Sequence, residues 1–177
     1  MSLQFLIDAS GLTALAVNAS GLARSSDASL RTKTGIASAL WALNNFFMGA
    51  YSAAALSALT VGRQATASAV HGTTERARRL GCVTFLLLTL ITGALTWQGP
   101  QTVFTTVGSS LSTYAMFYLR GAQLRYTMML VSLLWMYNAW AYHSWWQAAA
   151  NLMACAAAAF GAWRAQSSAP IEVRERT

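Results

Sequence analysis

Two long stretches without formal charge place the strongest constraint on how this 177-residue chain can fold. No Asp, Glu, Lys or Arg occurs between Lys33 and Arg63, or between Arg79 and Arg120. A helix that crosses the hydrocarbon of a bilayer needs about 20 mainly apolar residues, so each stretch can hold at least one crossing. Charged residues make up only 10% of the chain, against about a quarter of a soluble domain, which favours membrane helices over a soluble core.

Charge clusters and turn residues divide the chain into seven candidate membrane helices. Their expected ranges are 3–22, 34–51, 53–70, 80–97, 102–119, 126–142 and 146–163. The fourth segment is the most apolar, whereas the first contains Asp8 and Asn18 and the third contains Arg63. The division predicts an all-α membrane protein with seven transmembrane helices.

The positions of Arg and Lys residues predict the orientation of these helices, because such residues gather in cytoplasmic loops. They follow the first, third, fifth and seventh segments, and the alternate connections carry no charge; only Arg63 stands apart. The alternation predicts a multi-pass membrane protein, with its N-terminus outside and its C-terminus in the cytoplasm. The residues concerned are Arg24, Arg31, Lys33, Arg76, Arg78, Arg79, Arg120, Arg125, Arg164, Arg174 and Arg176.

Several other functions are not expected from the composition. The net charge of +7 is spread over short loops, so it indicates topology and not nucleic-acid binding. Cys82 and Cys155 are flanked by apolar or small residues, and neither a disulfide nor a thiolate metal site is predicted. His71 and His143 fall on opposite faces of the predicted bundle, about 30 Å apart, so they cannot share a metal or a haem. No catalytic motif appears, and we expect neither an enzyme nor a cofactor.

A short motif occurs twice. The stretch "LWALNNFF" at 40–47 is followed, ninety-four residues after its start, by "LWMYNAW" at 134–140. The same offset places Arg31 on Arg125. The alanine-rich third and seventh segments match only if an insertion is assumed, with "TVGR" at 60–63 on "GAWR" at 161–164.

The motif predicts an internal repeat of three helices, one linking helix and three helices. Two such halves would point the same way through the membrane, as in parallel-repeat transporters whose site lies between the halves. The expected units are a first bundle over 1–79, a linker over 80–101, a second bundle over 102–164 and a cytoplasmic tail over 165–177. A duplicated packing unit without a site would leave the same pattern.

Within each copy, tryptophan and asparagine stand three or four positions apart and therefore share one helix face. An amide beside a flat apolar ring suits a small ligand that carries hydroxyls or a ring. The same amides could instead clamp neighbouring helices. The candidate substrate-binding residues are Trp41, Asn44, Asn45, Trp135, Tyr137, Asn138 and Asn151. The run "AWAYHSWW" at 139–146 is typical of an interfacial aromatic belt.

Two charged residues are candidates for coupling or gating. Asp8 could bind a cation or proton, or could reach water from the outer end of its helix. Arg63 could line the inner path, or could snorkel to the cytoplasmic surface, and its match with Arg164 favours snorkelling.

The segments "WALNNFFMGAYSAAALSALTVGRQ" and "GSSLSTYAMFYLRGAQLRYTMMLVSLLWMYNAW" resemble the YgjV-type bacterial inner-membrane proteins. This resemblance implies an inner-membrane location and supplies no substrate. The plan of three, one and three helices is similar to that of the PnuC-type and SWEET-type transporters, in architecture only.

The sequence predicts a carrier or facilitator for a small polar solute, with nucleosides, vitamin precursors and sugars as candidate classes, that works by alternating access. One alternative is a non-transporting membrane partner or receptor, in which the amides only clamp helices. A second is an ion or proton channel, which would need Asp8 to face a wet path. The expected partners are the solute and the bilayer, and self-association stays open.

Overall fold

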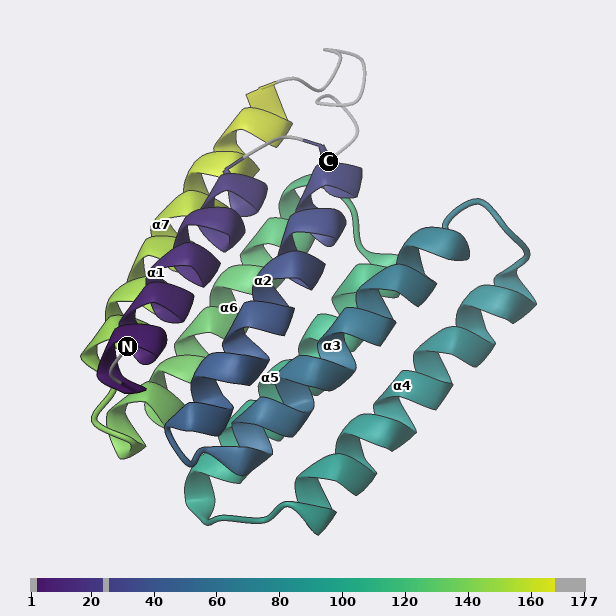
Figure 1. Ribbon diagram of the computed structural model, residues 1–177. Helices are drawn as coiled ribbons and strands as arrows, with labels where there is room; N and C mark the ends of the chain where they lie inside the picture. Colours follow the sequence, from purple (N-terminus) through teal and green to yellow (C-terminus); the bar gives the residue numbers. More distant parts are fainter. Residues whose placement is uncertain (1–2, 24–25, 168–177) are drawn as a thin grey trace.

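The protein is a bundle of seven helices, as the computed structural model of residues 3–23 and 26–167 shows (Figure 1). The helices are α1 (Leu3–Leu22), α2 (Asp27–Phe47), α3 (Tyr51–Ala69), α4 (Glu75–Leu95), α5 (Pro100–Tyr118), α6 (Gly121–Ala141) and α7 (Trp145–Ser167). The predicted all-α fold and the positions of the seven segments are confirmed within the described residues. The predictions for Arg24, Arg174 and Arg176, and for the tail from residue 168 onwards, lie outside them.

Three helices begin at least five residues earlier than predicted. α2, α4 and α6 begin at Asp27, Glu75 and Gly121, whereas the first charge-free residues suggested 34, 80 and 126. Hydrogen bonds to the first turn, and not the loss of charge, set these starts. The side chains of Ser26 and Thr74 accept hydrogen bonds from the third backbone N–H of α2 and α4. At α6, the Asp27 carboxylate accepts a hydrogen bond from the backbone N–H of Gly121. Most basic residues expected in loops therefore lie in the first turns of these helices, and α7 likewise extends past 163.

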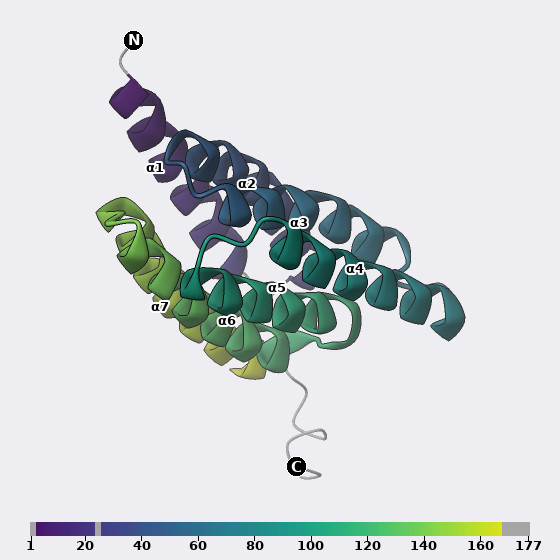
Figure 2. The ribbon, with the colours of Figure 1, turned by 90° about the horizontal axis from the view of Figure 1, so that it is seen from below.

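Two layers of three helices face each other. α2 packs between α1 and α3 in one layer, and α6 packs between α5 and α7 in the other. The layers touch along their edges, where α1 packs on α7 and α3 packs on α5, and α4 closes one side against α3 and α5. Figure 2, seen from below, shows α1, α2 and α3 in one row and α7, α6 and α5 in the other. The middle helices, α2 and α6, are thus held apart in the centre of the molecule.

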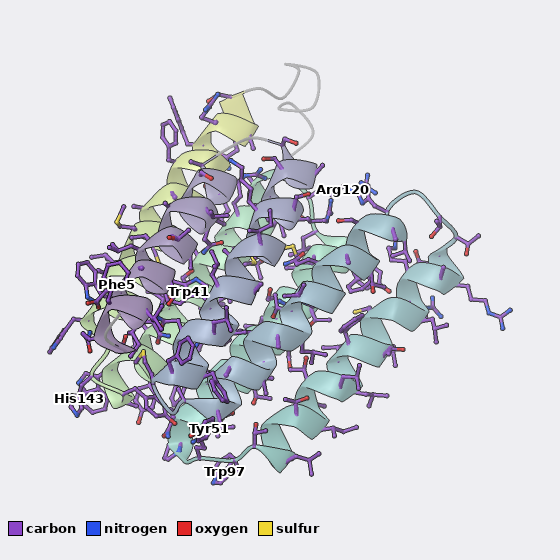
Figure 3. The ribbon with its side chains drawn as sticks, in the orientation of Figure 1. Phe5, Trp41, Tyr51, Trp97, Arg120 and His143 are labelled. Atoms are coloured by element: carbon purple, nitrogen blue, oxygen red, sulfur yellow. The ribbon has the colours of Figure 1, made fainter. Side chains whose placement is uncertain are left out.

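Charge divides the two ends of the bundle. The basic end holds Arg31, Lys33, Arg76, Arg78, Arg79, Arg120, Arg125 and Arg164, where α2, α4 and α6 begin. Its field acts on His71, whose pKa is lowered chiefly by the charge of Arg31, then by partial burial and by Arg120. The aromatic end, defined by Phe46, Tyr51, Trp97, Trp140 and Trp145, is exposed. Figure 3 shows Arg120 at one end and Tyr51 and Trp97 at the other.

The surface is apolar, although polar residues lower the average hydropathy of most helices. In the described chain, two helices, Gln4–Leu22 and Glu75–Leu95, are long and apolar enough to cross a bilayer by composition alone. The other helices carry polar residues, many of which are buried. Exposed side chains include Leu43 on α2, Leu130 on α6 and Phe160 on α7, whereas Asn44, Arg63 and Asn138 are buried. A hydropathy value averaged over a whole helix hides the difference between its apolar exposed face and its polar buried face. This difference is expected for helices that face lipid.

The two copies of the repeated motif end in the same turn. After α2, Gly49 has a φ of +76°, and the N–H groups of Gly49 and Ala50 donate to the carbonyls of Phe46 and Asn45. After α6, His143 has a φ of +50°, and His143 and Ser144 donate in the same way to Trp140 and Ala139. Both are Schellman motifs, which close a helix through a residue in the left-handed conformation.

This shared turn corrects the predicted register of the third and seventh segments. α2 and α6 begin at Asp27 and Gly121, and α3 and α7 begin at Tyr51 and Trp145, so both pairs keep the ninety-four-residue offset. No insertion lies between the members of each pair, and the expected match of Arg63 with Arg164 was wrong. At the constant offset, Arg63 corresponds to Ala157.

The main apolar core lies towards the basic end. It includes Leu22, Leu30, Met116, Phe117 and Leu124, with small residues of α7 packed against them. Small residues let α1 and α7 approach closely: a Cβ atom added to Gly161 would lie 1.9 Å from the carbonyl oxygen of Leu22. This packing leaves the polar interior of the bundle in its middle and towards the aromatic end.

Candidate functional site: a polar cavity between the layers

A cavity of about 100 Å³ lies between the two layers, in the space left by α2 and α6. Every helix except α4 contributes to its wall. Seven lining side chains carry hydroxyls, namely Thr34, Ser38, Ser57, Thr60, Ser109, Ser112 and Ser132. The amides of Asn18, Asn45, Gln147 and Asn151, the rings of Trp41 and Trp135, and the guanidinium of Arg63 complete the polar and aromatic lining. The wall can therefore offer many hydrogen bonds to a small solute.

Arg63 is the charged residue of this wall. It is 3% exposed, and its side chain extends from α3 towards α5. Nη1 donates to the Ser109 carbonyl at 2.7 Å and to Thr113 Oγ1 at 2.9 Å, while Nη2 donates to Ser112 Oγ at 2.9 Å and to Thr60 Oγ1 at 3.1 Å. The expectation that Arg63 snorkels to the surface was wrong, because the side chain is buried and its terminal nitrogens donate to neutral acceptors on α5 and α3.

Four buried amides form a cluster between the cavity and the aromatic end. Gln147 Nε2 donates to Asn45 Oδ1 at 2.6 Å and to Asn44 Oδ1 at 3.4 Å. Its Oε1 accepts a long hydrogen bond from Asn138 Nδ2 at 3.5 Å. All four side chains are at most 4% exposed. The asparagines of the two motif copies thus meet through one glutamine of α7.

Asn44 also fastens α2 to α1. Its Nδ2 donates to the carbonyl of Ile7 at 2.7 Å and to Ser10 Oγ at 3.2 Å. Asn44 does not line the cavity, so its geometry is that of a helix clamp. Asn138 likewise lies behind Gln147 and not in the cavity wall.

The remaining predicted site residues divide between the cavity and the surface. Trp41, Asn45, Trp135 and Asn151 line the cavity. Tyr137 does not, since its ring stacks on Phe104 with centroids 4.3 Å apart. Figure 3 labels Trp41 on α2 and His143 at the aromatic end.

Asp8 is not part of the cavity wall either. Its carboxylate accepts a hydrogen bond from Gln4 Nε2 at 3.0 Å, one turn earlier on the exposed side of α1. The cavity therefore has no carboxylate from α1, and the channel hypothesis lacks the group on which it depended.

Sequence reasoning missed Gln147, Asn18 and the hydroxyl residues. Gln147 follows "AWAYHSWW", which we interpreted as an interfacial belt, so its amide was overlooked. A signal was present, because Gln147 and Asn151 are four residues apart and share one face of α7. The hydroxyl residues give no such signal, since Ser and Thr can also bond to the preceding turn of their own helix, as Thr60 does to Leu56.

Acidic side chains of the described chain lie away from the cavity wall. Among the described residues, three acids are present, and none lines the cavity: Asp27 pairs with Arg125 at 2.6 Å, Glu75 pairs with Arg78, and Asp8 faces outward. In the same part of the chain, no three His, Cys, Asp or Glu side chains gather to hold a metal ion. The wall supplies fixed donors and acceptors around a small space.

The comparisons with known proteins identify a family without a described activity. The family model Imp-YgjV, described as bacterial inner membrane protein, matches residues 5–170. This match covers all seven helices almost completely. No curated protein and no solved structure matches the chain.

Proposed function

The chain belongs to the Imp-YgjV family of bacterial inner membrane proteins, and we propose that it carries a small polar solute across that membrane through the cavity between its helical layers. The observation that carries the proposal is that the outside of the bundle is apolar and its centre is polar, the reverse of a soluble protein. Large apolar side chains cover the outside, and hydroxyls, amides and one guanidinium line the centre. Polar groups inside a membrane bundle are costly and commonly mark a solute path.

Alternating access is the mechanism that suits this cavity. Hydrogen-bonded amides lie on its side towards the aromatic end, and a packed apolar core lies towards the basic end. We propose that the 3+1+3 plan lets the bundle α1–α3 rock against α5–α7, with α4 as the link. Opening towards the aromatic end would break the bonds of Gln147 to Asn44 and Asn45, which join the bundles.

The volume restricts the class of solute. The cavity measures about 100 Å³. Pockets for drug-sized ligands measure about 300–1,000 Å³. Within the classes predicted from sequence, the cavity therefore favours the smallest solutes. A nucleoside would require the layers to separate further.

The experiment is solute uptake by proteoliposomes that contain the purified protein. The panel runs from nucleosides, vitamin precursors and sugars down to solutes of a few heavy atoms. Accumulation above that of protein-free liposomes, reduced at least tenfold in Ser109→Leu, is the expected result. Ser109 lines the cavity, whereas its neighbour Ser110 bonds to Thr106 outside it, so Ser110→Leu is the matched control. Flux that does not differ between the two variants would contradict the proposal.

A non-transporting partner subunit is the second candidate. It is favoured by the clamp geometry of Asn44 and by the exposed Arg76 and Arg79 beside the connection of α3 to α4. Replacing Arg76 and Arg79 with Gln should leave uptake unchanged if the protein is a carrier. Loss of a co-purifying protein in this variant, without measurable uptake in the wild type, would favour the partner role.

A further inference from the structure

We propose that the cavity binds a small anion of carboxylate type, and that Arg63 is the residue that recognises its charge. The proposal rests on the proposed function for the use of the cavity as a solute site. It goes further by naming the chemical class of the solute.

Neutral groups bind the guanidinium of Arg63, and no carboxylate among the described residues neutralises its charge. Its two terminal nitrogens donate four hydrogen bonds, and every acceptor is a carbonyl or a hydroxyl. These bonds fix the plane of the guanidinium between α3 and α5. They leave its formal positive charge without an opposite charge in a site that is 3% exposed.

The acids of the described chain do not supply that opposite charge. Asp27 pairs with Arg125, Glu75 pairs with Arg78, and Asp8 accepts a bond from Gln4 on α1. A buried charge without a partner of opposite sign is strongly destabilising, as the loss of one member of a buried ion pair shows. Within the described residues, Arg63 is such a charge. A bound anion would remove the imbalance.

Unsatisfied polar atoms around the cavity match such a ligand. Within the described residues, Arg63 Nε and Ser109 Oγ are buried and have no hydrogen-bond partner, and both can donate to a carboxylate. Asn18 Oδ1, also buried without a partner, can accept from a hydroxyl. All three residues line the same cavity. A short hydroxycarboxylate such as lactate would therefore satisfy more of these atoms than acetate.

The size of the cavity favours small anions in this conformation. About 100 Å³ lies below the roughly 300–1,000 Å³ of pockets for drug-sized ligands, so a carboxylate of a few heavy atoms suits it better than a nucleotide. The terminal nitrogens of Arg63 are already engaged, so its Nε–H is the group that can donate a directed hydrogen bond to a carboxylate oxygen.

The test compares carboxylates with their neutral isosteres on the purified protein in detergent. Sodium acetate and sodium lactate are titrated beside acetamide and lactamide, with sodium chloride keeping the ionic strength constant, and the melting temperature is recorded. A ligand that binds the folded state raises that temperature in a saturable manner. We expect a rise with the carboxylates, larger for lactate, and none with the amides.

Variants of Arg63 assign the effect to the cavity. Arg63→Gln should weaken the apparent lactate affinity at least tenfold. Arg63→Lys, which keeps the charge and loses the planar fork, should weaken it less, and it serves if Arg63→Gln does not fold. Arg164→Gln removes the same charge from the exposed end of α7 and should leave the affinity unchanged.

Two results would overturn the inference and spare the proposed function: equal shifts with amides and carboxylates, or proteoliposome uptake of neutral solutes without any carboxylate shift. Equal lactate affinity in wild type, Arg63→Gln and Arg63→Lys would also overturn it. The absence of both binding and uptake for every solute would contradict the proposed function itself.

Discussion

At the scale of single residues, Gln147 connects the two copies of the motif. The paired tryptophans and asparagines could be recognised in the sequence, and Trp41, Asn45 and Trp135 do line one cavity. Their partner could not be recognised as easily, because a lone glutamine at the start of an alanine-rich helix has no repeat to mark it. Two asparagines that are adjacent in sequence differ in position: Asn44 bonds to α1 as a clamp would, whereas Asn45 lines the cavity.

Replacing Gln147 with Ala should destabilise the protein by about 1–2 kcal/mol. The substitution leaves the side-chain oxygen of Asn45 without its 2.6 Å donor and weakens the contacts of two further amides, and interhelical bonds in membranes contribute about 0.6 kcal/mol each. Unfolding in mixed micelles measures the change. Gln123→Ala on the exposed side of α6 is the control, and an equal effect there would contradict the role of the cluster.

Replacing His143 with Gly should stabilise the protein by about 1 kcal/mol. His143 has a φ of +50°, a conformation that costs a residue with a Cβ atom about 1–2 kcal/mol and costs glycine little. Gly49 occupies the equivalent position after α2, so Gly49→Ala should have the opposite sign. Melting temperatures of the two variants test the pair, and a lower value for His143→Gly would count against the shared turn.

At the scale of helices, the sequence located all seven segments but not their starts. Hydropathy marks where a helix can lie in lipid, and it does not mark where a cap begins it. The cap at Ser26 and the turns at Gly49 and His143 set the real bounds. They also set the register of α3 against α7. In that register "TVGR" at 60–63 and "GAWR" at 161–164 do not occupy equivalent positions.

Close packing of α1 on α7 depends on Gly161. A Cβ atom at this position would lie 1.9 Å from the carbonyl oxygen of Leu22, so Gly161→Ala must push the helices apart. Overpacking of this kind costs typically about 1–3 kcal/mol. Gly72→Ala, where a Cβ atom meets nothing within 4 Å, is the control for thermal unfolding. Equal stability of the two variants would show that the contact is looser than described.

At the scale of the whole molecule, the concentration of charge at one end predicts its orientation. The basic end should face the cytoplasm by the positive-inside rule. In a background without Cys82 and Cys155, a cysteine at Trp97 should react with an impermeant maleimide added outside cells with a permeabilised outer membrane. A cysteine at Thr73 should not react until the inner membrane is disrupted. The reverse pattern would invert the proposed topology.

The polar interior explains why hydropathy alone recognises only two of the seven helices. Arg63, Asn45 and Gln147 lower the average of their helices, although their side chains face the cavity. The number of segments could be predicted because charge and turn residues separate them. The cavity could not be located in advance, because it depends on which faces of α2 and α6 oppose each other across the layers.

The most direct test of the central claim is whether the cavity opens to both sides of the membrane. Ser132, on the cavity wall of α6, would be replaced with Cys in the cysteine-free background, and its reaction with a small anionic thiosulfonate would be timed from each side of proteoliposomes. The carrier account predicts reaction from both sides, slowed by Ser109→Leu and unaffected by Ser110→Leu. Failure to react from either side would contradict a solute path through this cavity.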